Sequence, residues 1–333
     1  TDDYFGMMDE GEGELGSADK QDVATGRFPV STLSEARDAV NKTLQYYAEN
    51  SFGDWRNTVT FVADDPDEPN EFVLQQTVDL IAQEVEATRP EFNLKKIYSD
   101  AYTQESTAGG ERYPDVNDAI DNAVESGTLV LDYFGHGGVN GWANERILEV
   151  PQVQRWSNFK SLPLFITVTC EFARFDNPLR PTAGEFALLN PDGGPVSLIS
   201  TTREIFISVG QVFNRTFFEK LFDEQANYAS ISEALMYSKH EFGSSQRFFV
   251  YYFGDPAMEL ALGKPDIKLT RINDRDVNQA RDTLKALSKV KLEGVVTDSE
   301  GNPMTGFNGT LSATIFDKAL DKTTLDNDNF GRK

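Results

Sequence analysis

Six apolar, β-rich runs separated by helical patterns constrain the fold of this 333-residue chain more than any other feature. The runs cover residues 23–28, 58–63, 94–99, 128–135, 162–169 and 195–200. Such alternation is typical of βαβ units and a mainly parallel sheet. Runs such as TLVLDYFG and LPLFITVT are apolar nearly throughout, as expected of strands that helices cover on both faces. We therefore predict one α/β domain over residues 22–264, with its sheet flanked by helices.

The segments between the runs carry helix signals. Thr32 and Glu35 have the spacing of a capping box before an expected helix over 36–48. A single apolar stripe marks the next helix at i, i+4, i+7 and i+11, and its members are Leu74, Val78, Ile81 and Val85. This spacing places the stripe on one helix face, toward the sheet.

The two ends of the chain have different patterns. Residues 1–21 are acidic and show no periodicity, which predicts a polar lead-in. After residue 264, apolar and polar residues alternate over 267–272, 290–297 and 310–316. This alternation predicts a truncated, β-sandwich-like (Ig-like) all-β module over residues 265–333.

Charge and cysteine content exclude several classes of protein. Lys plus Arg is 31 and Asp plus Glu is 54, so the net charge is 31 − 54 = −23, which opposes binding to nucleic acid. No apolar run approaches the ~18–20 residues of a membrane span. The single cysteine excludes an internal disulfide, and with only two histidines the chain cannot form a thiolate zinc cage.

Reactive side chains follow several of the expected strands. They are Asp64, Asp65, Asp100, His136 and Cys170. Because ligands of open α/β sheets bind outside the carboxyl ends of the strands, we expect these groups to gather at one sheet edge. The usual nucleotide, zinc-protease and serine-hydrolase fingerprints are absent from the sequence.

A thiol, an imidazole and a carboxylate together can perform nucleophilic catalysis. The imidazole of His136 can take the proton of the Cys170 thiol, and a carboxylate behind it fixes its tautomer. His136 lies between glycines, so a substrate chain can approach closely. The amides of Gly137 and Cys170 are candidates for an oxyanion hole.

Structural explanations compete with this one. A single cysteine at the end of a buried strand is most often a small hydrophobic residue, and a histidine in a glycine-rich loop is often structural. The acid behind His136 is undecided between Asp64 and Asp65, since one of them can cap the following turn. Asp100 and Asp132 are poorer alternatives.

Four segments resemble the gingipain family of cysteine peptidases, which have a caspase-like α/β fold. They are GRFPV at 26–30, YFGHG at 133–137, FITVTC at 165–170 and FGDP at 253–256. The resemblance implies that His136 is the general base, that Cys170 is the nucleophile, and that the amides of Gly137 and Cys170 form the oxyanion hole. It implies an acidic partner of the histidine near Asp64 or Asp65.

Further segments resemble the surface sortases of the bacterial type IX secretion system, a branch of this family. They are TCEFARFD at 169–176, AGE at 183–185, LKALSKVKLEGVVTD at 284–298 and FNGT at 307–310. This resemblance implies removal of C-terminal sorting domains from exported proteins, transfer of the cargo to anionic lipopolysaccharide, and a β-barrel partner at the outer membrane. The alternatives are a secreted endopeptidase without transfer activity and a peptidase-like binding module without turnover.

The sequence departs from the family at the expected specificity wall. Gingipains select Arg or Lys through an acidic pocket, whereas the corresponding wall here is apolar, with Glu71 as its one candidate acid. The wall residues are Phe134, Val168, Phe206 and Ile207. Basic-residue specificity is therefore not expected.

The resemblance implies no cofactor for the reaction, but gingipains resemble calcium binders. An acidic cluster near the N-terminus could supply oxygen ligands for a structural calcium ion, and it contains Asp2, Asp3, Asp9, Glu10 and Glu12. Its spacing is not that of an EF-hand, so we interpret these residues as solvated acids and assign no metal site.

Overall fold

The computed structural model describes residues 1–330 except 17, 224–229, 263–265, 279–283, 286, 299, 310, 312 and 316–319. The chain divides into two compact units, one made of Thr1–Leu260 with Leu320–Lys333 and the other of Ala261–Ala319. This division differs from the predicted one at both ends, because residues 1–21 and the C-terminal segment belong to the larger unit.

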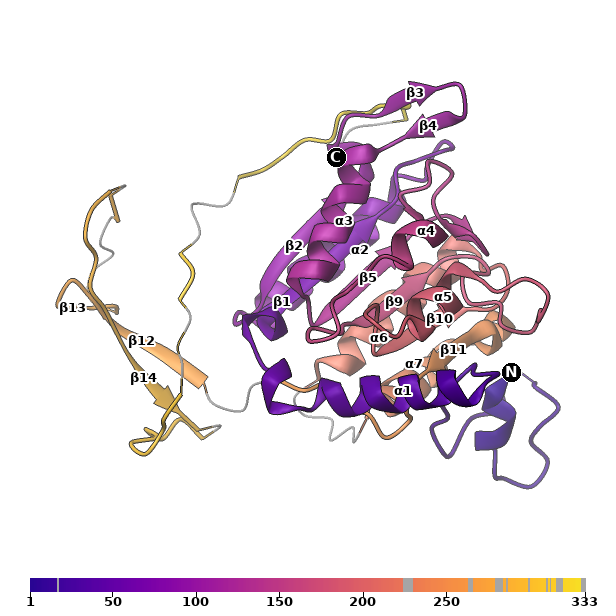
Figure 1. Cartoon of the computed structure of the whole chain (residues 1–333), viewed down its shortest axis with the longest axis horizontal. Coiled ribbons are helices and arrows are strands. Elements are labelled where there is room, and N and C mark those ends of the chain that lie inside the picture. Colours follow the sequence, from indigo (N-terminus) through magenta and orange to yellow (C-terminus); the bar gives the residue numbers. More distant parts are fainter. Residues whose placement is uncertain are drawn as a thin grey trace. The chain divides into compact units, whose positions relative to one another are not determined.

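A six-stranded sheet forms the centre of the larger unit (Figure 1). Its order is β11-β10-β9-β5-β1-β2, and β11 alone runs antiparallel to its neighbour. The strands are β1 (Thr58–Ala63), β2 (Asn93–Tyr98), β5 (Val130–Phe134), β9 (Leu164–Val168), β10 (Ser197–Thr201) and β11 (Val250–Phe253). The mainly parallel sheet is thus confirmed.

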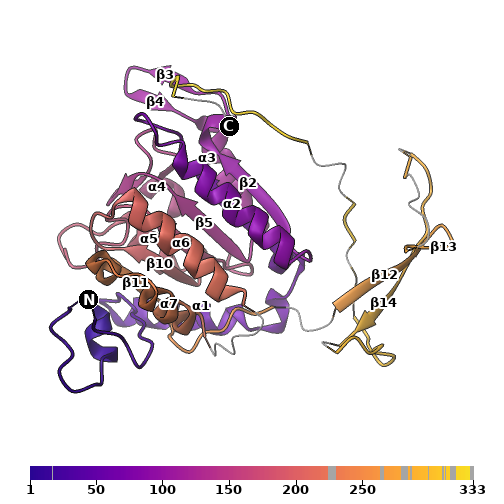
Figure 2. The same cartoon turned by 180° about the vertical axis from the view of Figure 1, so that it is seen from behind.

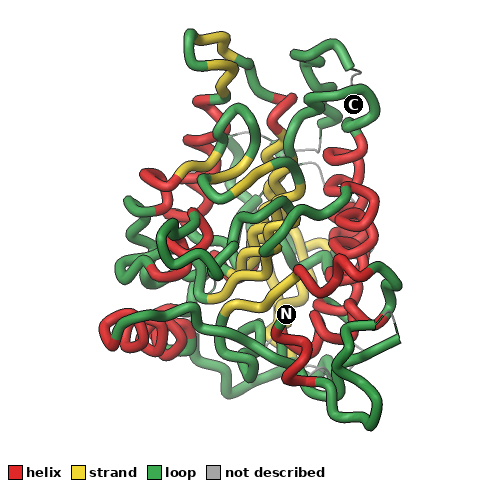
Figure 3. Tube along the Cα trace, turned by 90° about the vertical axis from the view of Figure 1, so that its right-hand side faces the viewer, coloured by secondary structure: helices red, strands yellow, loops and turns green. Residues whose placement is uncertain are grey.

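Helices cover both faces of this sheet, as the side view in Figure 3 shows. One face carries α1 (Leu33–Tyr46), α3 (Pro114–Ser126), α4 (Val150–Val153) and α5 (Ala183–Leu189), seen in front in Figure 1. The other face carries α2 (Val73–Thr88), α6 (Ile207–Leu221) and α7 (Ile231–His240), seen in front in Figure 2. Strands β1, β5, β9 and β10 are almost wholly buried between these layers, which explains their apolar composition.

Shorter elements complete the larger unit. The remaining strands are β3 (Glu105–Thr107), β4 (Gly110–Arg112), β6 (Gly137–Gly138), β7 (Gly141–Trp142) and β8 (Leu148–Glu149). The 3-10 helices are η1 (Asp2–Gly6), η2 (Glu49–Ser51), η3 (Asp54–Asn57), η4 (Ser99–Ala101) and η5 (Ser245–Phe249). No helix in the described part of the chain has both the length and the apolar character to cross a bilayer.

The first predicted strand is wrong. Residues 23–28 form only an isolated bridge between Arg27 and Phe253, at the edge where β11 closes the sheet. The Arg27 side chain pairs with Asp2 at 2.5 Å, so the segment serves to hold the N-terminal residues in place. Strand β11 takes the sheet position beside β10 and was not predicted.

The smaller unit contains β12 (Asp266–Ile272) paired antiparallel with β13 (Arg275–Asp276) and β14 (Leu292–Thr297). These strands match two of the three predicted runs. The third run, 310–316, lies partly outside the described residues, and its described residues 311 and 313–315 form no strand. The predicted domain boundary between residues 264 and 265 also lies outside the described residues. An Ig-like sandwich is therefore not confirmed.

Candidate active site

The strand order places His136 and Cys170 at the carboxyl edge of adjacent strands. The chain runs outward from β1 to β2 and then crosses to β5 on the other side of β1, so the order reverses there. In the parallel pair β5–β9, Phe134 lies opposite Val168. His136 and Cys170 each follow these paired residues by two positions, so the sheet places the two residues at neighbouring strand ends. Both were predicted to lie at this edge.

Cys170, which carries the thiol, lies next to a strained backbone position. Glu171, directly after Cys170, has a φ of 52°, a left-handed conformation that is uncommon for a residue with a side chain. The Cys170 Sγ lies 3.9 Å from the carbonyl oxygen of Ile205 and can donate a weak hydrogen bond to it. Burial raises the pKa of the Cys170 thiol, and the nearby carboxylates of Glu204 and Glu171 raise it further. The thiol is therefore protonated at neutral pH and needs a base.

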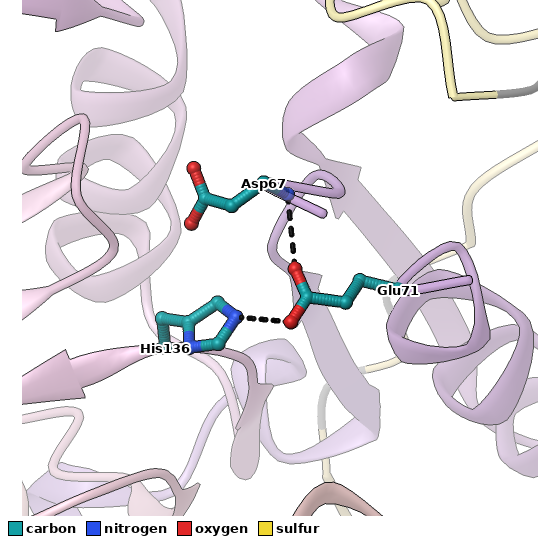
Figure 4. A group of neighbouring side chains, drawn as sticks. All are labelled: Asp67, Glu71 and His136. Atoms are coloured by element: carbon teal, nitrogen blue, oxygen red, sulfur yellow. Dashed lines mark hydrogen bonds and ion pairs between the residues drawn. The ribbon is translucent and has the colours of Figure 1, made fainter. Parts of the chain in front are cut away.

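The imidazole of His136 is held by Glu71 (Figure 4). The His136 Nε2 lies 3.1 Å from Glu71 Oε1, while Glu71 Oε2 accepts hydrogen bonds from the amides of Asp67 and Glu68. Because a carboxylate only accepts, Nε2 carries the proton of this contact and Nδ1 is left as the basic nitrogen. Glu71 was predicted to line the specificity pocket, yet in the structure it occupies the place of the orienting acid.

Asp64 and Asp65, the acids predicted for that place, contact other groups. Asp64 Oδ2 accepts a 2.8 Å hydrogen bond from the backbone amide of His136 and not from its ring. Asp65 Oδ2 accepts a 2.7 Å hydrogen bond from the Tyr113 hydroxyl. Burial raises the pKa of both carboxyls, and repulsion from neighbouring carboxylates raises it further. Asp64 therefore positions the backbone of the histidine, while Glu71 orients the ring.

The candidate oxyanion donors also lie at this edge. Gly137 and Gly138 form β6, which pairs with β7, and the His136 carbonyl accepts from the amide of Ala143. Since bonded and non-bonded positions alternate in an antiparallel ladder, the Gly137 amide points away from its partner Trp142. A Cβ on Gly137 would lie 2.6 Å from the hydroxyl of Thr169, the residue before Cys170. Only glycine allows the two loops to approach this closely.

Part of the predicted apolar substrate wall is not accessible. Phe134 and Val168 are 2% and 1% exposed, and both contact α6 at Gly210, where a Cβ would lie 2.8 Å and 3.0 Å from them. They belong to the core and cannot contact a substrate. In contrast, Phe206 is 71% exposed and follows Ile205, the residue that the thiol contacts. Ile207, half-buried, begins α6.

A hollow of about 740 Å³ opens beside the histidine. The loop 136–144 and Glu171 contribute to its lining, which contains several glycines and polar side chains. Backbone amides and carbonyls exposed in such a lining can pair with an extended peptide. The hollow thus has the polarity of a peptide-binding cleft and adjoins His136 and Glu171, while Cys170 is not among its lining residues.

Comparison with known proteins decides the family. A family model described as Peptidase family C25 matches residues 1–261. The chain belongs to peptidase family C25. The predicted gingipain relationship is thereby confirmed. No curated protein sequence matches the C25 chain.

Two solved structures with TM-scores above 0.5 support the same fold for this C25 chain. The crystal structure of the Arg-specific cysteine proteinase gingipain R (RgpB) has a TM-score of 0.62 at 17% identity, covering 81% of this chain and 62% of that one. A complex of Porphyromonas gingivalis RgpB pro- and mature domains has a TM-score of 0.58 at 16% identity, covering 76% and 60%. The chain thus spans about three fifths of these proteins. Dimeric latent PorU from Porphyromonas gingivalis gives 22% identity and a TM-score of 0.35, covering 93% and 24%.

Several acidic groups of the C25 chain lie close enough together to hold a metal ion. One group contains Asp67, Glu71 and His136, a second contains Asp9, Glu12 and Asp22, and a third contains Asp64, Asp65 and Glu145. The acids considered as possible calcium ligands divide in the structure, because Asp9 and Glu12 stay together beside Asp22 whereas Asp2 and Asp3 do not join them. Asp2 and Asp3 pair with Arg27 and Lys239, so their charges are already compensated.

Two features of the site were not predicted from the sequence. Glu71 was not assigned to the imidazole, although the turn residues around Asp67 before α2 were a signal that this loop returns toward the sheet edge. Glu145, which lies nine residues after His136 and is buried beside Asp64 and Asp65, was not predicted either. No local pattern marks Glu145, because its neighbours come from a distant part of the sequence.

Proposed function

We propose that this C25 chain is a cysteine peptidase and transpeptidase that works at the bacterial cell surface. The observation that carries the proposal is the matched placement of Cys170 and His136 at the ends of adjacent parallel strands. In this proposal Cys170 is the nucleophile, His136 is the base and Glu71 orients the imidazole. The amides of Gly137 and Cys170 stabilise the oxyanion.

The proposed reaction begins with proton transfer from the Cys170 thiol to Nδ1 of His136 as the sulfur attacks a peptide carbonyl. The carbonyl oxygen becomes an oxyanion, which the two amides stabilise. The carbon–nitrogen bond then breaks, and the leaving amine takes the proton from Nδ1. The acyl part of the substrate stays on Cys170 as a thioester.

The second half of the proposed reaction decides between hydrolysis and transfer. Water yields a free acid, whereas an amine yields a new amide, and His136 takes the proton of either nucleophile. A bound amine can reach an effective molarity of ~10⁵ M or more, well above the concentration of water. The exposed Phe206, next in the chain to Ile205 whose carbonyl the thiol contacts, supports this half, because an apolar side chain near the thioester can shield it from water.

We assign the substrate class from the resemblance to the type IX surface sortases. Residues 169–176 include the nucleophile and residues 284–298 lie beyond the family match, so the resemblance extends outside the peptidase region. The proposed substrates are exported proteins with C-terminal sorting domains, and the proposed acceptor is anionic lipopolysaccharide. An outer-membrane β-barrel protein is the proposed partner. Secreted endopeptidase activity without transfer is the competing assignment.

Mass spectrometry of the intact protein tests the proposal. The full chain is incubated with a peptide that spans the junction before a sorting domain, with and without an added amine. We expect an acyl adduct on Cys170 and, with the amine, a transfer product. The Cys170→Ala protein is the control and should give neither. If the adduct forms but saturating amine gives only the hydrolysis product, the protein is a peptidase and the proposed transfer activity is rejected.

A further inference from the structure

The thiol of Cys170 makes its hydrogen bond to a neighbouring segment and not to the imidazole. Its Sγ lies 3.9 Å from the carbonyl oxygen of Ile205, while the imidazole of His136 pairs with Glu71. In the described part of the chain, no hydrogen bond joins the side chains of Cys170 and His136. A thiol can rotate about its Cα–Cβ bond, so the acceptor that it contacts sets its resting position. The place of the Ile205 carbonyl therefore determines where the nucleophile lies before it reacts.

One side chain holds the backbone on both sides of Ile205. The Oε1 of Gln246 accepts a 3.0 Å hydrogen bond from the amide of Phe206, and its Nε2 donates to the carbonyl of Glu204 at 3.5 Å. Only the carboxamide of an asparagine or a glutamine offers an acceptor and a donor side by side in this way. Gln246 thus pairs with the segment as the backbone of a neighbouring strand would.

The Phe206 amide and the Ile205 carbonyl belong to the same peptide unit. This unit is planar and trans, so its N–H and C=O bonds point in opposite directions. The N–H donates to Gln246 on one side, and the C=O accepts from the Cys170 thiol on the other side. The hydrogen bond to Gln246 therefore fixes the direction of the carbonyl that the thiol contacts.

Regular secondary structure does not hold this peptide unit. Strand β10 ends at Thr201, where its pairing with β11 also ends. Helix α6 begins at Ile207, and within the described residues its N-cap, Phe206, has no side-chain cap hydrogen bond. Phe206 is also 71% exposed, so packing alone does not fix it. The side chain of Gln246, which lies in η5, holds the connection between the two elements.

We propose that Gln246 is a positioning residue, which acts on the Cys170 thiol through the Ile205 carbonyl. The proposal rests on the proposed function, in which Sγ attacks a peptide carbonyl and His136 takes its proton. Such an attack needs a defined starting position of Sγ, because misplaced reacting atoms lose much of their effective molarity. Without Gln246, the peptide unit can rotate and the thiol can occupy several rotamers. The rate of acylation should then fall although the fold is preserved.

Gln246→Met is the variant that tests the proposal. Methionine is similar to glutamine in length and volume, but it neither donates nor accepts a strong hydrogen bond. Gln211→Met is the matched control, because Gln211 is also half-buried and donates one hydrogen bond, to Thr77 on α2. The hydrogen bonds of Gln246 are exposed, so their loss should cost little stability. Both variants should keep the wild-type Tm to within about 4 °C.

Raman spectroscopy of the full chain measures the environment of the thiol directly. Cys170 is the only cysteine of the chain, so the S–H stretching band reports on this one group. A hydrogen bond from a thiol to a carbonyl lowers the S–H frequency. The band should therefore move to higher frequency in Gln246→Met and stay unchanged in Gln211→Met. An unchanged band in Gln246→Met would overturn the proposal, whatever reaction the protein catalyses.

Single-turnover acylation by the peptide that spans the junction before a sorting domain measures the effect on the reaction. At saturating peptide, the rate should fall by about tenfold in Gln246→Met and stay at the wild-type value in Gln211→Met. If the Raman band moves but the rate does not change, Gln246 has no role in the reaction and the proposal is wrong. If the band moves but even the wild-type protein forms no adduct, the proposed function fails, whereas the positioning of the thiol by Gln246 is confirmed.

Discussion

Replacement of Glu71 by Gln isolates the contribution of the acid that holds the imidazole. The carboxylate uses both oxygens, one toward His136 Nε2 and the other toward the amides of Asp67 and Glu68. A glutamine has only one accepting oxygen. Its NH₂ group must therefore face either the imidazole or the backbone amides, both of which need an acceptor. The ring loses its charged partner whichever way the amide turns.

The expected magnitude follows from this geometry. A hydrogen bond to a charged group contributes about 1.5–3 kcal/mol. The imidazole side chain is 34% exposed, so water screens part of the interaction, and we use the lower half of that range. At about 1.4 kcal/mol per factor of ten, Glu71→Gln should lower the rate of acylation of Cys170 by about 10–40-fold. KM should change little, because Glu71 is assigned to the base and not to substrate binding.

Single-turnover acylation, followed by intact mass, measures this effect. Glu68→Gln is the matched control, since Glu68 contributes only its backbone amide to Glu71 and its side chain is exposed. The control should react at the wild-type rate. If Glu71→Gln reacts as fast as the control, Glu71 does not orient the base, and the assignment fails.

Three further predictions concern the thiol and the interior. Cys170→Ala should lower peptide processing by at least about 10⁴-fold while shifting Tm by less than about 3 °C in differential scanning fluorimetry, because only one half-buried sulfur is removed. Burial raises the pKa of the Cys170 thiol, so the rate of alkylation by iodoacetamide should still be rising with pH where an ordinary thiol levels off. If the alkylation rate levelled off below about pH 8, as it does for a thiolate stabilised by its surroundings, the thiol would not be in the buried environment described here. Asp3→Ala leaves Lys239, 3% exposed, without the carboxylate that it contacts at 2.5 Å, and should cost about 3–5 kcal/mol in a denaturant titration. Asp2→Ala, which removes the more exposed pair with Arg27, should cost less than about 1 kcal/mol, and equal losses would refute the assignment of the buried pair.

Local patterns were sufficient to predict the centre of the fold. The runs over 58–63, 128–135 and 162–169 are apolar because helices cover both faces of β1, β5 and β9, and that composition is visible without a structure. In a parallel sheet the carboxyl ends of the strands lie at the same edge, so the sequence alone could place His136 and Cys170 together. The structure adds the register, in which Phe134 pairs with Val168, so that His136 and Cys170 follow at equivalent positions.

Long-range contacts explain what the sequence could not provide. Residues 23–28 have strand composition, but Asp2 and β11 determine where Arg27 lies, and both come from elsewhere in the chain. Phe134 and Val168 face away from the cleft because α6 covers them, which no local pattern reveals. Asp328 reaches Asp65 from more than two hundred residues away. Interactions of this kind depend on the completed fold.

One short segment controls both the ring and the backbone of the candidate base. Asp64, directly after β1, accepts a hydrogen bond from the His136 amide. Glu71, before α2, accepts one from the ring Nε2 of His136. The carbonyl of His136 accepts a 2.6 Å hydrogen bond from the hydroxyl of Tyr133. The ring of Tyr133 in turn stacks on the buried Trp142. The histidine is therefore fixed at its amide, carbonyl and ring, which limits its freedom before a substrate binds. A change that moves the 64–71 segment should thus impair the base even where it leaves the Cys170 turn intact.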